Sequence, residues 1–130
     1  MAITYLMDSN VLIDYTSRKF PTQTEGTLDK IFDTGFHFSI ISRMEVLGFD
    51  APTEILKKLD EFLSIGIMYP LSKEIADACI LIRRKHPKVK LPDAIIAANA
   101  ILYHHTLLTS DVDDFKNIEG LTIENPRLLQ

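Results

Sequence analysis

The stretch ITYLMDSN, residues 3–10, predicts how the chain folds. Its first half is apolar and β-prone, which is typical of a buried strand. Asp8, Ser9 and Asn10 follow at once, and short polar residues of this kind cap the N-termini of helices. We therefore expect a buried strand followed directly by a helix that begins at Val11 and is capped by Asn10.

Short apolar runs followed by helical stretches recur along the whole chain. The predicted strands are residues 3–7, 36–41, 65–69, 107–109 and 121–123. Apolar residues at helical spacing predict helices after Pro52, after Ser72 and from Leu91 to Leu102. Strands that alternate with helices need crossover connections, which produce a mostly parallel sheet covered on both faces. The expected fold class is α/β, with three layers in the order α/β/α.

Two of the predicted helices have features that place them in the fold. The helix after Ser72 should stop at His86, because Pro87 disfavours helical geometry in the residue before it. The helix from Leu91 is apolar on nearly every side over residues 94–102. We expect this last helix to be packed deeply in the core.

The composition is that of an ordinary globular protein. The chain has 130 residues, of which 46% are hydrophobic and 25% charged, so we expect a single domain over residues 1–130. The longest apolar run is far shorter than the ~20 residues of a membrane span. The start of the chain lacks the features of a secretion signal, and the lone Cys79 has the spacing of a buried core thiol. We therefore expect a cytoplasmic protein.

Four acidic residues stand at the ends of predicted elements. Asp8 directly follows the first strand, and Asp111 follows the strand at residues 107–109. In a parallel sheet, functional groups gather at the edge formed by the carboxyl ends of the strands. Glu45 and Asp93 are predicted in the first turns of helices, from which they can point toward this edge. We expect the four side chains to meet there.

Each acid also has a purely structural interpretation. Asp8 can cap a helix, Asp93 can complement a helix dipole, and Ser42 with Glu45 matches a capping box. As a set, however, the acids favour a metal site, because two carboxylates ~4 Å apart repel by about 4 kcal/mol at an effective dielectric of 20. Oxygen ligands without softer donors select Mg²⁺, or Mn²⁺, over zinc.

The adjacent His104 and His105 do not extend this predicted metal site. Neighbouring residues of a helix point about 100° apart, so the two rings are poorly placed to hold one ion. We interpret both histidines as a surface feature.

Basic residues cluster just before Asp93. The five are Arg83, Arg84, Lys85, Lys88 and Lys90. They can bind the phosphates of a substrate, or they can simply form a solvated helix end that the helix dipole favours. The formal net charge of -4 argues against a protein that coats nucleic acid by bulk attraction. It does not argue against nucleic acid as a substrate.

The order of these motifs resembles that of PIN-domain nucleases, and especially that of the VapC-type toxins of prokaryotic toxin–antitoxin pairs. The matching segments are MDSNVLID at residues 7–14, the Glu of SRMEVLG at 42–48, PDAIIAANA at 92–100 and LLTSDVDDF at 107–115. The resemblance extends over nearly the whole chain, from Tyr5 to about Phe115.

The resemblance implies roles for individual residues. The catalytic and metal-binding acids of the family correspond to Asp8, Glu45, Asp93 and Asp111. Asn10 and Thr109 correspond to polar positions that support the acids. The fourth acidic position varies within the family, so Asp113 or Asp114 could share or replace the role of Asp111. In the resulting hypothesis, Asp8 and Asp93 hold the principal Mg²⁺, Glu45 orients the attacking water or acts as the base, and Asp111 completes the site.

The same resemblance implies the biological setting. It predicts a Mg²⁺-dependent ribonuclease that is the toxin of a type II toxin–antitoxin system and forms a homodimer. A cognate antitoxin would cover the acidic cleft by inserting a cation such as Arg. Two alternatives remain open at this point: a PIN-like module that binds RNA or protein without cutting, and a phosphatase with an aspartyl nucleophile. The phosphatase is disfavoured because such enzymes place a second Asp two positions after the first, where this chain has Asn10.

Overall fold

A computed structural model describes residues 2–129 and contains one central sheet of five strands. The strands are β1 (Tyr5–Met7), β2 (His37–Ser39), β3 (Ile67–Tyr69), β4 (Thr106–Leu108) and β5 (Ile123–Glu124). Their order across the sheet is β3-β2-β1-β4-β5, and every pairing is parallel. All five overlap the predicted apolar runs, so the predicted α/β class with a parallel sheet is confirmed.

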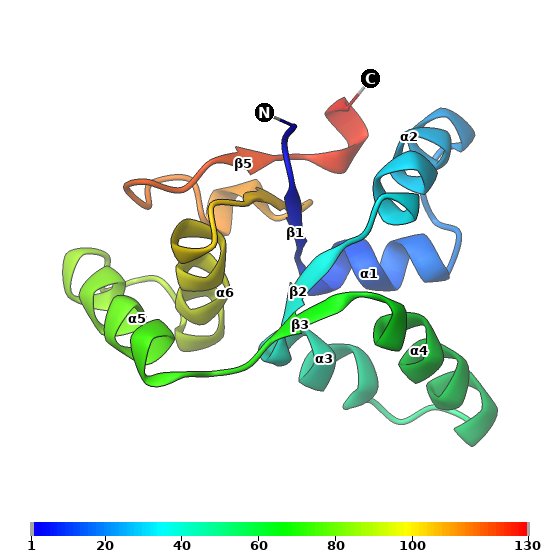
Figure 1. Cartoon of the computed structure of the whole chain (residues 1–130), viewed down its shortest axis with the longest axis horizontal. Helices are drawn as coiled ribbons and strands as arrows, with labels where there is room; N and C mark the ends of the chain where they lie inside the picture. The colour runs from blue at the N-terminus through cyan, green and yellow to red at the C-terminus, as the bar shows by residue number, and fades with distance from the viewer. Residues whose placement is uncertain (1, 130) are drawn as a thin grey trace.

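Residues 2–129 also contain six α-helices and two short 3-10 helices, the last of which follows β5. They are α1 (Ser9–Thr16), α2 (Thr22–Asp33), α3 (Ile40–Leu47), α4 (Thr53–Ile65), α5 (Lys73–Lys85), α6 (Leu91–Leu102), η1 (Val112–Asp114) and η2 (Pro126–Leu128). Figure 1 shows α5 and α6 on one side of the sheet and α1 to α4 on the other. None of the helices within residues 2–129 is long and apolar enough to cross a membrane.

The alternation of side chains along the strands builds a core on each face of the sheet. Leu6 and Leu107 pack with α6, whereas their neighbours Met7 and Leu108 pack with α1 to α4. This is the two-residue period of a strand whose faces are both covered. The sheet is therefore the middle layer of the predicted α/β/α arrangement.

The predictions for α5 and α6 are confirmed in their main features. Residues 94–100 of α6 are all buried, which fits a helix that is apolar on nearly every side. α5 ends at Lys85 with His86 as its C-cap, as expected from the proline that follows. Cys79 on α5 is 4% exposed and unpaired, so the prediction of a buried core thiol is also confirmed.

Two predicted helix starts are wrong, and each true start lies closer to the preceding strand. Asn10 does not cap the first helix: α1 begins at Ser9, and the Asp8 carboxylate accepts a hydrogen bond from the backbone of Ser9. Likewise α3 begins at Ile40 and is capped by Ser39, so the capping box from Ser42 does not exist. Both β1 and β2 are only three residues long, and a polar residue at the end of each becomes the cap: Asp8 directly after β1, and Ser39 as the last residue of β2.

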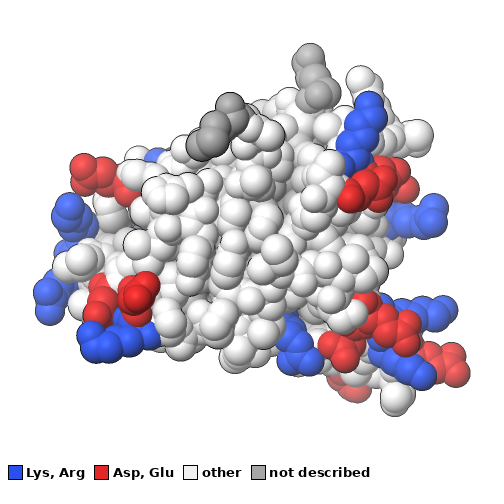
Figure 2. Space-filling model, in the orientation of Figure 1, with Lys and Arg blue, Asp and Glu red and all other residues white. Residues whose placement is uncertain are grey.

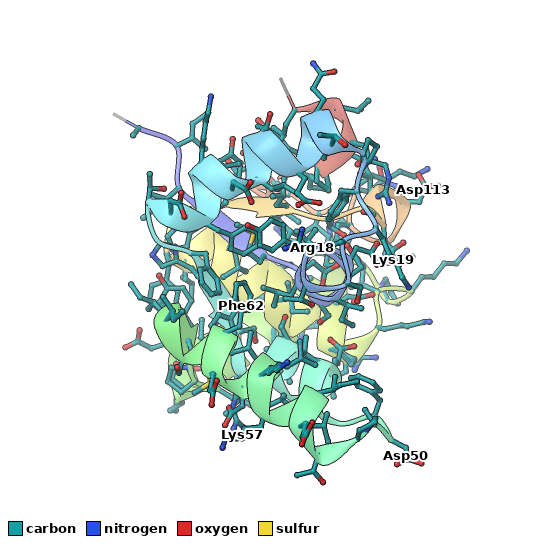
Figure 3. The ribbon with its side chains drawn as sticks, turned by 90° about the vertical axis from the view of Figure 1, so that its right-hand side faces the viewer. Arg18, Lys19, Asp50, Lys57, Phe62 and Asp113 are labelled. Carbon is teal, nitrogen blue, oxygen red and sulfur yellow. The ribbon has the colours of Figure 1, made fainter. Side chains whose placement is uncertain are left out.

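The sequence patterns gave no indication of α2, which buries only Leu28 and Phe32 among its apolar side chains. Two buried apolar residues in twelve form a weak periodic signal, and Gly26 lowers the intrinsic helix propensity further. The helix is held by tertiary contacts, because Phe32 stacks on Tyr15 with ring centroids 4.1 Å apart. Figure 3 shows Phe62 of α4 lying between α2 and α4, where its ring is 5.5 Å from that of Phe32.

The interpretation of His105 as a surface feature is wrong. Its two ring nitrogens form hydrogen bonds with the hydroxyls of Thr4 and Tyr69, both at 2.6 Å. The ring also stacks on His37 at 4.2 Å between centroids. Pairing of β1, β2 and β4 brings these distant residues together, which local helical spacing does not reveal. His104 is exposed, as expected.

Candidate active site

The strand order creates a point where the chain reverses direction across the sheet. From β1 the chain adds β2 and then β3 on one side, and it returns through α5 and α6 to place β4 on the other side of β1. In open α/β sheets, ligands bind at the carboxyl ends of the strands beside such a reversal. Asp8 follows β1 at this point and Thr109 follows β4. The candidate site therefore lies between the ends of β1 and β4.

Asp8 is the buried centre of this site, with only 6% of its surface exposed. One carboxylate oxygen, Oδ1, accepts from the backbone of Ser9 at 2.8 Å. The other, Oδ2, accepts from Thr109 Oγ1 at 2.7 Å and from Asn10 Nδ2 at 3.0 Å. Three donors thus hold the carboxylate in one orientation, as expected for a functional group that must be preorganised.

Asn10 links the start of α1 to the loop after β4. Its Nδ2 donates to Asp8 and also to Asp111 Oδ2, the latter at 3.1 Å. Its Oδ1 accepts from the backbone of Ser110 at 3.0 Å. Because Asp8 and Asp111 accept from the same nitrogen, they lie within two hydrogen-bond lengths of each other. Asn10 and Thr109 therefore contact the acids that the sequence predicted them to support.

Glu45 reaches the same site from α3, although it lies in the second turn of that helix and not in the predicted first turn. Its Oε1 accepts a hydrogen bond of 2.6 Å from Ser9 Oγ. Ser9 is almost buried and was not predicted to belong to the site. The sequence feature that could have identified Ser9 is its position directly after Asp8, in the first turn of α1. A short hydroxyl at that position lies beside the functional group at the end of the strand.

Asp93 enters from the third position of α6, in the first turn as predicted. Proline at the second position fits a helix start, since it lacks the amide hydrogen that a first turn leaves unused. The deep packing of α6 then holds the Asp93 backbone against the sheet edge. The acid is partly buried, in contrast to the exposed Lys90 that precedes the helix.

The pKa values reflect the crowding of these carboxylates. Burial raises the pKa of Asp8 above its ordinary value, and the charges of Glu45 and Asp111 raise it further. Burial also raises the pKa of Asp93 to about 6, and the carboxylates of Asp8 and Asp114 act in the same direction. Burial is thus the main cause of both shifts, and repulsion between nearby carboxylates adds to it. The four predicted acids are thus brought together at one edge of the sheet.

The three acids after β4 are placed differently. Asp111 contacts Asn10 as described, and Asp114 is close enough to Asp93 to raise its pKa. Asp113 pairs with Lys116 at 3.4 Å, and its side chain is 90% exposed. Figure 3 shows Asp113 at the periphery of the molecule. Asp111 and Asp114 are therefore placed to serve the site, whereas Asp113 is an exposed residue of the pocket beside Asp93 and pairs with a lysine.

The basic residues divide into two groups. A pocket of about 530 Å³ lies against Asp93 and Asp114, and its lining includes Lys85, Lys88, Lys90 and Lys116. Arg83 and Arg84 instead line a separate hollow with Cys79, Ile80, Pro87 and Leu91. Only part of the cluster predicted to bind substrate therefore adjoins the acids, and Lys116 joins it from a distant part of the chain.

The donor set suits a hard divalent cation, although the acids are not yet arranged around one. Within residues 2–129, no three side chains of His, Cys, Asp or Glu converge as a complete set of ligands would. Glu45 and Asp111 are instead turned toward hydrogen-bond donors on Ser9 and Asn10. The oxygen-only chemistry and the mutual repulsion of the acids both fit Mg²⁺ or Mn²⁺. A bound cation would replace these hydrogen bonds as the partner of the carboxylates.

Comparison with solved structures supports the fold. A chain of a toxin–antitoxin complex from Klebsiella pneumoniae is 29% identical with a TM-score of 0.78, and the match covers 95% of this chain and 98% of that one. A chain of DNA-bound VapBC from Salmonella typhimurium is 21% identical with a TM-score of 0.80, covering 96% and 99%. FitAcB from Neisseria gonorrhoeae contains a chain that is 21% identical with a TM-score of 0.78, covering 97% and 100%.

The sequence itself supplies the family. A search of curated proteins found no match. The model of the PIN domain family, however, matches residues 5–121, which include all four candidate acids and the strands that carry them. The chain therefore belongs to the PIN domain family.

Proposed function

We propose that the protein is a Mg²⁺-dependent ribonuclease and the VapC-like toxin of a type II toxin–antitoxin system. The observation that carries the proposal is the convergence of Asp8, Glu45, Asp93 and Asp111 on the β1/β4 edge. Burial, and after it repulsion among these acids, raises the pKa values of Asp8 and Asp93, and a divalent cation would relieve the repulsion. Membership of a nuclease family supports the same reaction class.

The chain's own residues divide the work of phosphodiester hydrolysis. Asp8, fixed by Thr109 and Asn10, and Asp93, fixed by α6, would hold the metal, with Mn²⁺ able to replace Mg²⁺. The ion supplies charge stabilisation and a more acidic water. Glu45 lies on α3 and would orient the attacking water or accept its proton. Asp111, or Asp114 beside Asp93, would complete the site.

The experiment is RNA cleavage by the purified chain with Mg²⁺, beside Asp8→Asn and Asp93→Asn. Each variant should lose at least about 100-fold in rate, because it removes a charged ligand while keeping the shape. Asp77→Asn is the matched control, since Asp77 is exposed on α5 and pairs only with Lys73. Single-stranded DNA of the same sequence tests the preference for RNA. Equal rates in the parent and both site variants would refute the assignment.

The two alternative functions, a phosphatase and a binding module, predict different experimental results for the same protein samples. An aspartyl phosphatase would form a phosphoaspartate at Asp8 that can be trapped, and it would place a second Asp two positions on, where this chain has Asn10. A binding module would bind RNA without cutting it and would show no Mg²⁺ or Mn²⁺ binding in calorimetry. The cost of keeping the acids together without a cation argues against that module.

A cognate antitoxin is the protein partner that we propose. The similar structures from Klebsiella pneumoniae and Salmonella typhimurium are described as a toxin–antitoxin complex and as VapBC. A partner that places a cation such as Arg among the acids would relieve the same repulsion as a metal ion and block the site. Co-expression with the product of the neighbouring reading frame should yield a stable complex in which RNA cleavage is suppressed.

We also propose that a second copy of the chain covers the β3 edge of the sheet. Ile67 and Met68 of this edge strand are 54% and 39% exposed, and the unpaired edge of a sheet favours association. Figure 2 shows that the centre of the face crossed by β3 in Figure 1 carries no charged residues. Light scattering should report a dimer for the parent and a monomer for Met68→Lys.

A further inference from the structure

We propose that the pocket beside Asp93 binds the phosphates of the RNA strand next to the scissile bond, through Lys88, Lys90 and Lys116. RNA as the ligand rests on the function proposed above. The location of the pocket comes from the structure alone: it lies between the α5–α6 loop and the turn after η1. It extends the acidic site in one direction and defines a path for the strand.

The position of Lys90 is unfavourable for a purely structural lysine. It is the N-cap residue of α6, and its side chain caps no backbone group. A cation at this end of a helix opposes the helix dipole, whereas an acid there would be favoured. Lys90 and Asp93 line the same pocket, so Lys90 is close to the acidic site. An anionic ligand at this place would account for the charge.

The positive charge of Lys88 is likewise not explained by the helix dipole or by an ion pair within residues 2–129. It lies in the loop after α5, beyond the helix end whose dipole favours basic residues. Among residues 2–129, neither Lys88 nor Lys90 forms an ion pair with a carboxylate. Both ammonium groups are therefore available to a phosphate.

Lys116 completes the pocket from the opposite wall. It pairs with Asp113 at 3.4 Å, and both side chains are more than half exposed. An exposed pair of this kind contributes little stability, so a phosphate could take the place of Asp113. The sequence did not associate Lys116 with the other lysines, because 26 positions separate it from Lys90 along the chain.

The pocket is continuous with the acidic site, and this sets the direction of the RNA strand. Asp93 and Asp114 line the pocket and also belong to the group of mutually repelling carboxylates. A phosphate held at the acids would therefore leave the adjoining nucleotide over the lysines. Arg83 and Arg84 line a different hollow, so the structure assigns them no contact with this strand.

The experiment compares two double variants that each remove two positive charges. Lys88→Ala/Lys116→Ala removes two pocket lysines, and Lys73→Ala/Arg84→Ala removes two exposed charges of α5 outside the pocket. Both are made in the full-length Asp8→Asn chain, which should bind without cutting. The probe is fluorescein-labelled single-stranded RNA, titrated at several salt concentrations, and thermal melting checks that each variant is folded.

The pocket variant should bind at least about 10-fold more weakly at low salt, and the slope of log Kd against log salt should fall by about 1.4, since each lost single-strand phosphate contact contributes about 0.7. The control should stay within about twofold of the parent in both quantities. Equal loss in the two variants, or no loss in the pocket variant, would overturn the proposal. A separate outcome tests the nuclease assignment. If RNA binds through the pocket lysines in the Asp8→Asn chain, but the chain with Asp8 restored does not cut it, only the nuclease assignment is refuted. With Asp8 restored, an active enzyme should show the pocket substitutions as a raised KM with kcat within about twofold.

Discussion

The two ends of the central sheet both bring polar side chains together, but they satisfy them in opposite ways. Near the amino ends of β1, β2 and β4, Thr4, His37 and His105 form a closed group with Tyr69, the last residue of β3, in which hydroxyls and rings are partners for one another. At the carboxyl ends, Asp8 and the other acids repel one another. The hydrogen bonds of the first group are formed within the chain, whereas the second concentrates negative charge where we propose that a cation binds.

The titration behaviour of the two ends reflects this difference. Burial, aided by the nearby His37, lowers the pKa of His105 to about 4, so the ring is neutral and suited to accept one hydrogen bond and donate another. Burial and neighbouring charges raise the pKa of Asp93 to about 6. A network that is satisfied internally stabilises the fold, and one that repels itself costs stability until it binds a ligand. This contrast supports the proposal that the carboxyl end carries the function.

The largest expected effect on stability is at the amino end. His105→Ala removes both hydrogen bonds and the stacking partner of His37, and it leaves the hydroxyl of Tyr69 without its partner. The free energy of unfolding should fall by about 3 kcal/mol in chemical denaturation, while Mg²⁺ affinity stays unchanged. His104→Asn is the control, because Asn tolerates the positive φ of 59° at this exposed position. A loss below about 0.5 kcal/mol would contradict a structural role for the network.

The second prediction concerns the donors that hold Asp8. Thr109→Val keeps the side-chain shape but removes the hydroxyl that donates to Asp8 and accepts from the backbone of Asp111. Metal affinity and RNA cleavage should fall by about 10- to 100-fold, which is typical when the partner of a metal ligand is lost. Thr106→Val, in the same chain segment but at the far end of β4, is the matched control. Comparable losses in the two variants would mean that the effect comes from β4 packing.

A smaller and opposite effect on stability is expected at the acidic end. The folded-state pKa of Asp93 lies above its ordinary value of 3.8, so the ionised carboxylate opposes folding. The stability that this group contributes is fully present below its unfolded pKa and is lost as the pH rises through about 6. Without metal at pH 7, Asp93→Asn should therefore be more stable than the parent by about 1 kcal/mol, allowing for solvent screening of a partly exposed group.

The test is denaturation of the metal-free parent and Asp93→Asn between pH 4 and pH 8, compared pairwise so that other groups cancel. The difference between their free energies of unfolding should grow as the pH rises. It should shrink or change sign when Mg²⁺ is added, because only the parent keeps the full set of ligands. A difference that is independent of pH and metal would show that the other acids do not affect the ionisation of Asp93.

The smallest expected effect is the local titration of His105. Its folded-state pKa of about 4 lies below the ordinary value of 6.5, so the fold favours the neutral ring. The stability from this preference is present above about pH 6.5 and is lost as the pH falls toward 4. NMR titration of the imidazole should show one ring that stays neutral at pH 5. Protonation of His105 near its ordinary pKa would indicate that the network is open to water.

Local patterns predicted the parts of the fold that depend on periodicity. The short apolar runs correspond to all five strands, and the continuous apolar face of α6 correctly indicated its deep burial. The pattern failed for α2, where Leu28 and Phe32 are too few to produce a period and aromatic packing holds the helix. It also misplaced the caps of α1 and α3 by two and three residues, because several nearby polar residues were equally able to cap.

The sequence alone determined which elements would form and that acids would stand at their ends, since both follow from side-chain types at short spacings. Only the tertiary structure decided the partners: Asn10 between Asp8 and Asp111, Ser9 beneath Glu45, and Lys116 opposite Lys88. These contacts join residues dozens of positions apart in the chain. They depend on β4 pairing beside β1 and on α3 and α6 packing against the sheet, which no local spacing encodes.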